Sequence, residues 1–113
     1  MNRDEIPPGT LYLLILKTLA RHVELHGYEI ANSIQRTSDD VLQVEEGSLY
    51  PALHRLERRG LVEAEWGPSE ANRQAKYYLL TRAGKKALAV QTSAWQQMQQ
   101  AIGLIMDYRP VET

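Results

Sequence analysis

The pattern of residues 47–66, GSLYPALHRLERRGLVEAEW, changes from helical to strand-like within a few positions, and this change constrains the fold more than any other feature. At 100° per residue, the apolar side chains of the first part fall on one side of a helix and the basic ones on the other. The apolar side consists of Leu49, Ala52, Leu53 and Leu56, and the opposite side of Pro51, His54, Arg55 and Arg58. The pattern predicts a short helix with one side in the core and a basic side facing outward.

Residues typical of helix termini mark both ends of this helix. Ser48 is a favourable N-cap, and Pro51 then falls in the first turn, where a missing amide hydrogen costs little. Gly60 is the expected C-terminal cap. We therefore expect the first-turn amides and the Tyr50 hydroxyl to point outward, where they could meet a phosphate or a base edge.

A β-hairpin is predicted directly after the helix. In residues 61–66, Val62, Ala64 and Trp66 alternate with acidic residues, which is typical of a half-buried strand. Residues 76–80 are the expected partner strand, and the polar sequence GPSEANRQ supplies the turn between them. Three helices followed by such a hairpin form the element order of a winged helix-turn-helix.

The tip and second strand of the hairpin hold further candidate residues. Arg73 lies near the tip, and Asn72 before it tolerates the left-handed conformation that a tight turn requires. Tyr77 and Tyr78 point to opposite faces of the strand, so one is expected in the core and the other exposed. The pattern leaves open which of the two is buried.

Two helices are predicted before the basic one. Residues 10–22, capped by Thr10, are apolar nearly all round, so this helix should be buried on more than one side. Residues 27–35 form a second helix with a narrow apolar stripe. The sequence VLQVEEG, residues 41–47, fits either a short strand or a linker.

A long helix is predicted at the end of the chain, from residue 82 to residue 108, capped by Thr81 and ended by Pro110. At 1.5 Å per residue it would be about 40 Å long, which exceeds the span of the region before it. Its apolar residues recur at heptad spacing in a coiled-coil-like seam that Gln91 and Gln99 interrupt. The residues of this seam are Leu88, Trp95, Met98, Ile102, Ile105 and Met106. We expect the seam to pack against a second copy of the chain.

The charge is distributed unevenly along the chain. The net charge is −1, yet residues 48–86 contain eight Lys and Arg against four Asp and Glu. Because screening limits electrostatic reach to roughly 8 to 10 Å at physiological salt, a local basic patch matters more to DNA than the total charge. The composition therefore permits binding to nucleic acid.

Four segments, in this order and spacing, resemble the PadR family of bacterial transcriptional regulators. They are GTLYLLILKTL, HGYEIANSI, GSLYPALHRLERRGLVEAEW and KYYLLTRAGKKAL, and they cover most of residues 9–88. The resemblance implies a mainly α fold with a β-hairpin wing and a C-terminal dimerisation helix. It also implies a homodimeric repressor that binds an inverted-repeat operator. The expected divisions are a winged helix-turn-helix (residues 1–80), a dimerisation helix (81–108) and a tail (109–113).

The resemblance also implies roles for individual residues. The positions that match the recognition helix are Ser48, Tyr50, Pro51, His54 and Arg55, and those that match the wing are Arg73, Lys76 and Tyr77. Arg58 joins these DNA-binding candidates because it lies on the outward basic side of the helix. Some small members of the family stack planar aromatic compounds on a tryptophan of the terminal helix. Trp95 is the equivalent candidate here, although a tryptophan in such a seam can also serve packing alone.

Other functions find less support in the sequence. A dimeric protein-interaction module that keeps the winged fold without binding DNA is the alternative, and the overall acidity is compatible with it. His22 and His26 are too few for a zinc site without cysteine, so a helix terminus with a turn is expected there. No catalytic constellation or phosphate-binding loop is present, so we expect neither an enzyme nor a cofactor. The absence of cysteine, of an export signal and of a long apolar run predicts a cytoplasmic protein without a membrane span.

Overall fold

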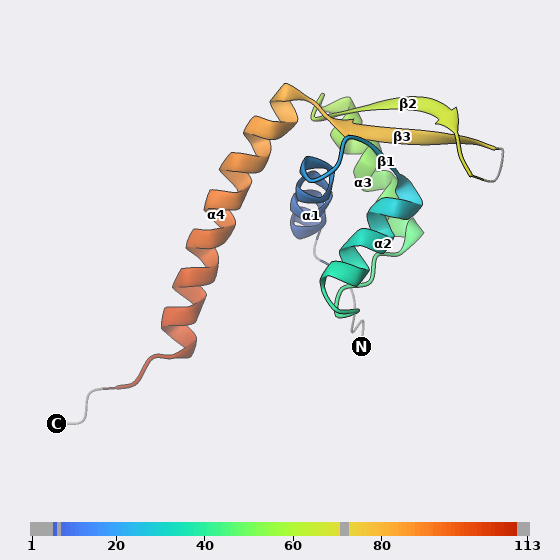
Figure 1. The fold of residues 1–113 in the computed structure, drawn as a ribbon. Helices are drawn as coiled ribbons and strands as arrows, with labels where there is room; N and C mark the ends of the chain where they lie inside the picture. Colours follow the sequence, from blue (N-terminus) through green and yellow to red (C-terminus); the bar gives the residue numbers. More distant parts are fainter. Residues whose placement is uncertain (1–5, 7, 71–72, 111–113) are drawn as a thin grey trace.

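The computed structural model describes residue 6, residues 8–70 and residues 73–110, and it contains four helices and three strands. Figure 1 shows the first three helices as one cluster, the β2–β3 hairpin across it, and the fourth helix leading away from it. In chain order the elements are α1 (Pro8–Ala20), β1 (Leu25–His26), α2 (Gly27–Thr37), α3 (Glu46–Arg58), β2 (Val62–Pro68), β3 (Gln74–Leu80) and α4 (Arg82–Met106). The predicted fold class, a winged helix-turn-helix with a long C-terminal helix, is confirmed.

The core lies where α1, α2 and α3 meet the start of the hairpin. Its buried side chains are Leu11, Ile15, Leu16, Leu19, Ile30, Ile34, Leu49, Ala52, Leu53, Leu56, Val62 and Tyr78. All four residues of the predicted apolar side of α3 belong to it, so the helical pattern is confirmed. This packing fixes which side of α3 faces outward.

The start of α3 differs from the sequence prediction. Ser48 is not the N-cap: the helix begins at Glu46, and Glu45 occupies the cap position without a side-chain hydrogen bond. The amides of Ser48 and Leu49 bond to the Glu45 carbonyl at 3.0 and 2.9 Å, which places the first turn three residues earlier than predicted. Pro51 consequently lies in the second turn rather than the first, so it interrupts the helical hydrogen bonds instead of occupying a position where no bond is needed.

The end of α3 agrees with the prediction. Gly60 has a φ of +74°, and its amide bonds to the Glu57 carbonyl at 3.0 Å. The amide of Leu61 bonds to the Leu56 carbonyl at 2.9 Å, which completes a Schellman motif that needs the left-handed conformation glycine adopts most easily. The linker before α3, residues 38–45, contains no strand. The linker alternative for this segment is therefore correct, although the last residues of VLQVEEG already belong to α3.

The sheet is antiparallel with the order β1-β3-β2. The hairpin pairs in register from Val62 opposite Leu80 to Pro68 opposite Gln74. The first strand, β1, was not predicted, because two residues are too few to form a recognisable pattern. It pairs with β3 through Leu25 and thereby attaches the hairpin to the beginning of α2.

The hairpin extends beyond the core. Val62 is 1 % exposed and Ala64 is half-buried, but Trp66 is 69 % exposed. The expectation that Trp66 lies on the buried face of the strand with Val62 and Ala64 is therefore wrong. Figure 1 shows the β2–β3 hairpin extending past the helices toward its tip.

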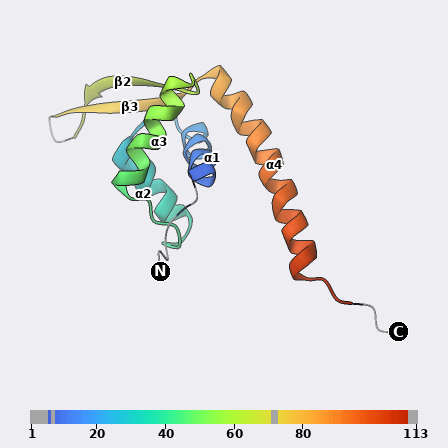
Figure 2. The same ribbon diagram turned by 180° about the vertical axis from the view of Figure 1, so that it is seen from behind.

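The last helix, α4, begins as predicted and runs away from the other helices. The Thr81 side chain accepts a hydrogen bond from the Gly84 amide at 2.9 Å, which confirms the cap, and α4 ends at Met106. Its first turns contact α1 and β3. Figures 1 and 2 show its later part diverging from the cluster, and the longest principal axis of the molecule reaches 70 Å. Among the described residues, no helix is long and apolar enough to cross a membrane.

Candidate nucleic-acid interface

The side of α3 opposite the core is exposed and carries basic residues. Pro51, His54 and Arg58 are all exposed, at positions turned away from buried Leu49, Leu53 and their neighbours. Within the described part of the chain, neither His54 nor Arg58 has a hydrogen-bonded or ionic side-chain partner. These groups are therefore free to contact an external ligand.

The candidate Arg55 and the neighbouring Arg59 face the first helix. Arg55 Nη1 donates a hydrogen bond to the Tyr12 hydroxyl at 3.2 Å, and the Arg59 guanidinium lies 5.7 Å from the centre of the Tyr12 ring. Ser48 and Arg55 also line a shallow cavity of about 210 Å³ between α1 and α3. The contacts of Tyr12 were not foreseen, because they depend on how α1 packs against α3. Arg55 is exposed, but it is held by a neighbour that His54 and Arg58 lack.

Tyr50 lies at the contact between α2 and α3. A Cβ atom at Gly27 would come within 2.8 Å of the Tyr50 ring, so the ring rests directly on the glycine backbone at the start of α2. Tyr50 is nevertheless 43 % exposed. The Gly27 backbone therefore packs against one part of the ring, while another part remains accessible to a ligand.

The wing is attached to α3 by an ion pair. Lys76 Nζ lies 3.2 Å from Glu57 Oε1, and the two side chains are 28 % and 35 % exposed. Lys76 also lies 5.7 Å from the centre of the Tyr78 ring. The structure therefore places Lys76 in a contact within the chain, unlike the free cation that a wing residue suggests.

The two adjacent tyrosines of β3 have different environments. Tyr78 is 5 % exposed and belongs to the core, and burial raises the pKa of its phenol above the ordinary value, against the smaller opposing effect of Lys76. Tyr77 lies on the other face, where its hydroxyl donates to the Pro68 carbonyl at 2.8 Å and its ring centre is 5.6 Å from that of His26. Tyr78 is thus the buried residue of the pair, and the hydroxyl of Tyr77 is used inside the hairpin.

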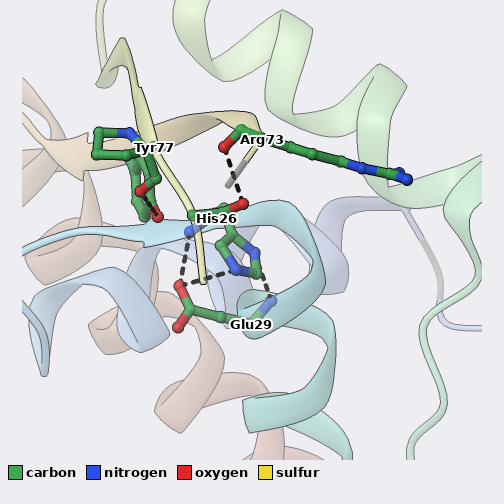
Figure 3. Close-up of polar contacts among 6 residues, drawn as sticks. His26, Glu29, Arg73 and Tyr77 are labelled. Atoms are coloured by element: carbon green, nitrogen blue, oxygen red, sulfur yellow. Dashed lines mark hydrogen bonds and ion pairs between the residues drawn. The ribbon is translucent and has the colours of Figure 1, made fainter. Parts of the chain in front are cut away.

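The tip of the wing is closed by hydrogen bonds to Arg73. The amide and the hydroxyl of Ser69 both donate to the Arg73 carbonyl, each at 2.8 Å. The Arg73 side chain is exposed, and Figure 3 shows it extending away from His26, Glu29 and Tyr77. Asn72, expected to ease the turn, lies outside the described residues. Arg73 thus presents an exposed guanidinium from a backbone that Ser69 fixes locally.

His26 has a structural role that the sequence did not reveal. Its Nδ1 accepts a hydrogen bond from the Glu29 amide at 3.3 Å, and Glu29 Oε1 accepts from the His26 amide at 3.0 Å, which forms a capping box at the start of α2 (Figure 3). The predicted turn before a helix is therefore correct. Among the described residues, no group of three potential metal ligands occurs.

The predicted seam of α4 divides into two parts. Leu88 is partly buried against the core of its own chain. The remaining seam residues are exposed: Trp95 by 47 %, Met98 by 61 %, Ile102 by 50 %, Ile105 by 73 % and Met106 by 77 %. A second set of exposed apolar residues, Val90, Leu104 and Tyr108, escaped the sequence analysis. Val90 and Leu104 are two heptads apart on another side of α4, whereas Tyr108 follows the end of the helix.

Comparisons with known proteins agree with this arrangement. The family described as transcriptional regulator PadR-like matches residues 15–90. An uncharacterised protein from Lysinibacillus sphaericus is 31 % identical over 107 residues, which cover 95 % of this chain and 97 % of that protein. A putative transcriptional regulator from Thermoplasma acidophilum is 32 % identical with a TM-score of 0.75, covering 91 % and 96 % of the two chains. A PadR family transcription regulator from Clostridium difficile is 28 % identical with a TM-score of 0.73, covering 85 % and 97 %.

Proposed function

Because this chain belongs to the PadR-like family of transcriptional regulators, we propose that it represses transcription as a homodimer bound to an inverted-repeat operator in double-stranded DNA. The observation that carries the proposal is the outward side of α3, where His54 and Arg58 are exposed beside a wing held against the same helix. In this fold the third helix enters the major groove and the hairpin follows the backbone. Repression would follow from occlusion of a promoter.

The proposed contacts differ in what they contribute. Donors on the outward side of α3, from His54, Arg58 and the supported Tyr50, would meet base edges and nearby phosphates. Arg73 at the tip of the wing would meet the backbone. Ser48, Pro51 and Arg55 would line the side nearest α1, while Lys76 and Tyr77 would act mainly by holding the wing in place.

The proposed dimer uses the exposed seam of α4. A row of large apolar side chains from Trp95 to Met106 is rarely left in water on a monomeric protein. Pairing of two such helices by twofold symmetry would repeat the recognition helix about 34 to 36 Å away, or at a multiple of this distance. We expect Ile102→Glu to weaken self-association at least tenfold in sedimentation equilibrium. Gln97→Glu, an exposed position off the seam, should leave it unchanged.

The salt dependence of DNA affinity tests the proposal. Fragments of the source genome that the protein binds would first be selected in vitro, and affinity for them measured from 50 to 300 mM salt. About six phosphate contacts per dimer predict a log-log slope near −5. An affinity that varies little with salt, or no selected fragment at all, would support the protein-interaction alternative instead.

Substitutions separate the proposed roles. Arg58→Ala and His54→Ala should relax the preference for the selected sequence, whereas Arg73→Ala should weaken binding to selected and random DNA alike. Arg36→Ala removes an exposed cation from the end of α2 and is the matched control. It should change neither the preference for the selected sequence nor the affinity for random DNA. Equal losses for Arg36 and Arg58 would contradict a specific role for α3.

A planar aromatic ligand on Trp95 is the proposed effector, and it would act by changing the angle between the paired α4 helices. Trp95 lies in the middle of the exposed seam, 47 % exposed, where a second copy would bring two indole rings together. Binding would be measured by fluorescence quenching in a Trp66→Phe background, which leaves Trp95 as the sole tryptophan. The idea fails if Trp95→Ala alters neither dimerisation nor ligand binding.

A further inference from the structure

Gly47, near the start of α3, has no function inside the chain that the described residues reveal. A Cβ atom built there would meet no heavy atom within 4 Å. Gly27 and Gly84 lie against other groups and Gly60 has a positive φ, whereas Gly9 in α1 and Gly103 in α4 lie, like Gly47, in open space. Glycine weakens a helix relative to alanine because it loses more backbone freedom on folding. Its use at position 47 therefore lowers helix stability without a compensating contact among the described residues.

Gly47 lies on the outward side of α3. Pro51, His54 and Arg58 follow it by four, seven and eleven residues, spacings that return to the same face of a helix. All four residues are exposed. Gly47 and Pro51 have no long side chain, whereas His54 and Arg58 have basic side chains that extend from the helix. The side chains of this face therefore project less at its N-terminal end than at its C-terminal end.

Pro51 strengthens this interpretation. In an α-helix the amide of residue 51 would donate to the carbonyl of Gly47, but proline has no amide hydrogen. Gly47 and Pro51, both unfavourable in a helix, thus occupy adjacent turns of one face. Together they expose backbone that in most helices is covered by side chains.

We infer that Gly47 is the point of closest approach between α3 and DNA. This inference rests on the proposed function and adds a positioning residue to it. Without a Cβ atom at position 47, the N-terminal end of α3 can lie directly against a base edge or deoxyribose, while His54 and Arg58 reach outward from the later turns. A methyl group at this position would hold the helix away from the groove and lengthen the hydrogen bonds made by its neighbours.

The test is Gly47→Ala, with Gly103→Ala in α4 as the matched control. Both glycines are helical, and a Cβ atom at either would meet nothing within 4 Å. Alanine should keep or raise the midpoint of thermal unfolding at both positions. We expect Gly47→Ala to weaken binding to a selected genomic fragment at least tenfold, and Gly103→Ala to change it less than twofold, at protein concentrations where the wild-type chain is fully associated.

Each outcome is decisive. The inference is overturned if Gly47→Ala binds the selected fragment within twofold of the wild type, or if it lowers the unfolding midpoint, which would reveal an internal role. If the wild-type protein itself selects no DNA, the proposed function fails and the inference fails with it. If the wild type binds but Gly47→Ala does not differ from it, the inference alone fails.

Discussion

The three helices of the winged region and the distal part of α4, residues 90–106, both carry many apolar side chains, but only those of the first three helices are buried within the chain. Ile15 and Leu16 of α1 are 0 % exposed, whereas Ile105 and Met106 of α4 are 73 % and 77 % exposed. The side of α4 that begins by packing on the core through Leu88 continues outward with no neighbour among the described residues. An amphipathic pattern thus identifies a side to be covered, and only the fold decides whether the same chain covers it.

A pair of leucine substitutions is expected to have the largest effect on this comparison. Leu53 in α3 is 0 % exposed, so Leu53→Ala should lower the free energy of unfolding by about 2 to 5 kcal/mol. Leu104 in α4 is 70 % exposed and lies off the predicted seam, so Leu104→Ala should change the free energy of unfolding by less than about 0.5 kcal/mol. Urea unfolding followed by circular dichroism measures both. Equal losses would mean that the distal helix is packed as tightly as the core.

The contact between the start of α4 and the rest of the fold should be the next most sensitive to substitution. A Cβ atom at Gly84 would collide with the Leu61 carbonyl and approach the Leu80 side chain. Because the obstacle is backbone, Gly84→Ala should cost about 1 to 3 kcal/mol. Gly27→Ala is the matched control: there the obstacle is the end of the Tyr50 side chain, which can rotate, so the loss should be smaller. A Gly84 variant as stable as the wild type would show that the start of α4 is not fixed by this contact.

The features that the sequence predicted correctly depend on neighbouring residues. The apolar side of α3, the left-handed Gly60 and the Thr81 cap each follow from residues within about one turn of one another. Local hydrogen bonds and helix periodicity determine them wherever the helix lies in the fold. The order of the elements also followed from these local patterns, and the family resemblance added the expected dimer and the residues matched to the recognition helix and the wing.

The features that were missed depend on contacts between distant residues. Strand β1 exists because Leu25 meets Tyr78 across the sheet, and Lys76 is paired because β3 passes Glu57 of α3. Trp66 has the alternation of a half-buried strand, but its burial depends on cover from other elements, and it is 69 % exposed. The start of α3 was placed too late because Ser48 is a better N-cap than Glu45 in isolation, whereas the extended backbone at Glu45 decides the boundary.

The buried phenol of Tyr78 should also make the stability of the core depend on pH. Burial raises its pKa, so in the folded state its phenol stays protonated to a higher pH than in the unfolded state. The contribution of the protonated phenol to the free energy of unfolding is fully present below the ordinary tyrosine pKa of about 10. This contribution is lost as the pH rises above that value. Because a single proton is involved, the free energy of unfolding can fall by at most about 1.4 kcal/mol per pH unit.

Phenylalanine substitutions test this expectation. Urea unfolding between pH 8 and pH 11 should show a smaller alkaline loss of stability in Tyr78→Phe than in the wild type. Tyr28→Phe is the control, because Tyr28 is 67 % exposed and should leave the pH dependence unchanged. An identical alkaline loss in the wild type and in Tyr78→Phe would contradict the burial of the phenol.

The ion pair between Lys76 and Glu57 should have the smallest effect on stability, yet it bears on function. Because both side chains are about one-third exposed, Glu57→Gln should cost only about 0.2 to 1 kcal/mol. The substitution frees Lys76 and removes a negative charge from α3, so DNA affinity should rise by about two- to fivefold and the salt slope should steepen by up to about 0.9 per subunit.

A charge-matched control decides what Lys76 does. Glu63→Gln removes the same charge from an exposed position on β2 and leaves the ion pair intact, so any gain it shares with Glu57→Gln comes from net charge alone. A larger gain in Glu57→Gln would identify Lys76 as a DNA contact restrained by its partner. A loss of affinity would show instead that the pair positions the wing, since the freed lysine would then fail to compensate for a displaced hairpin.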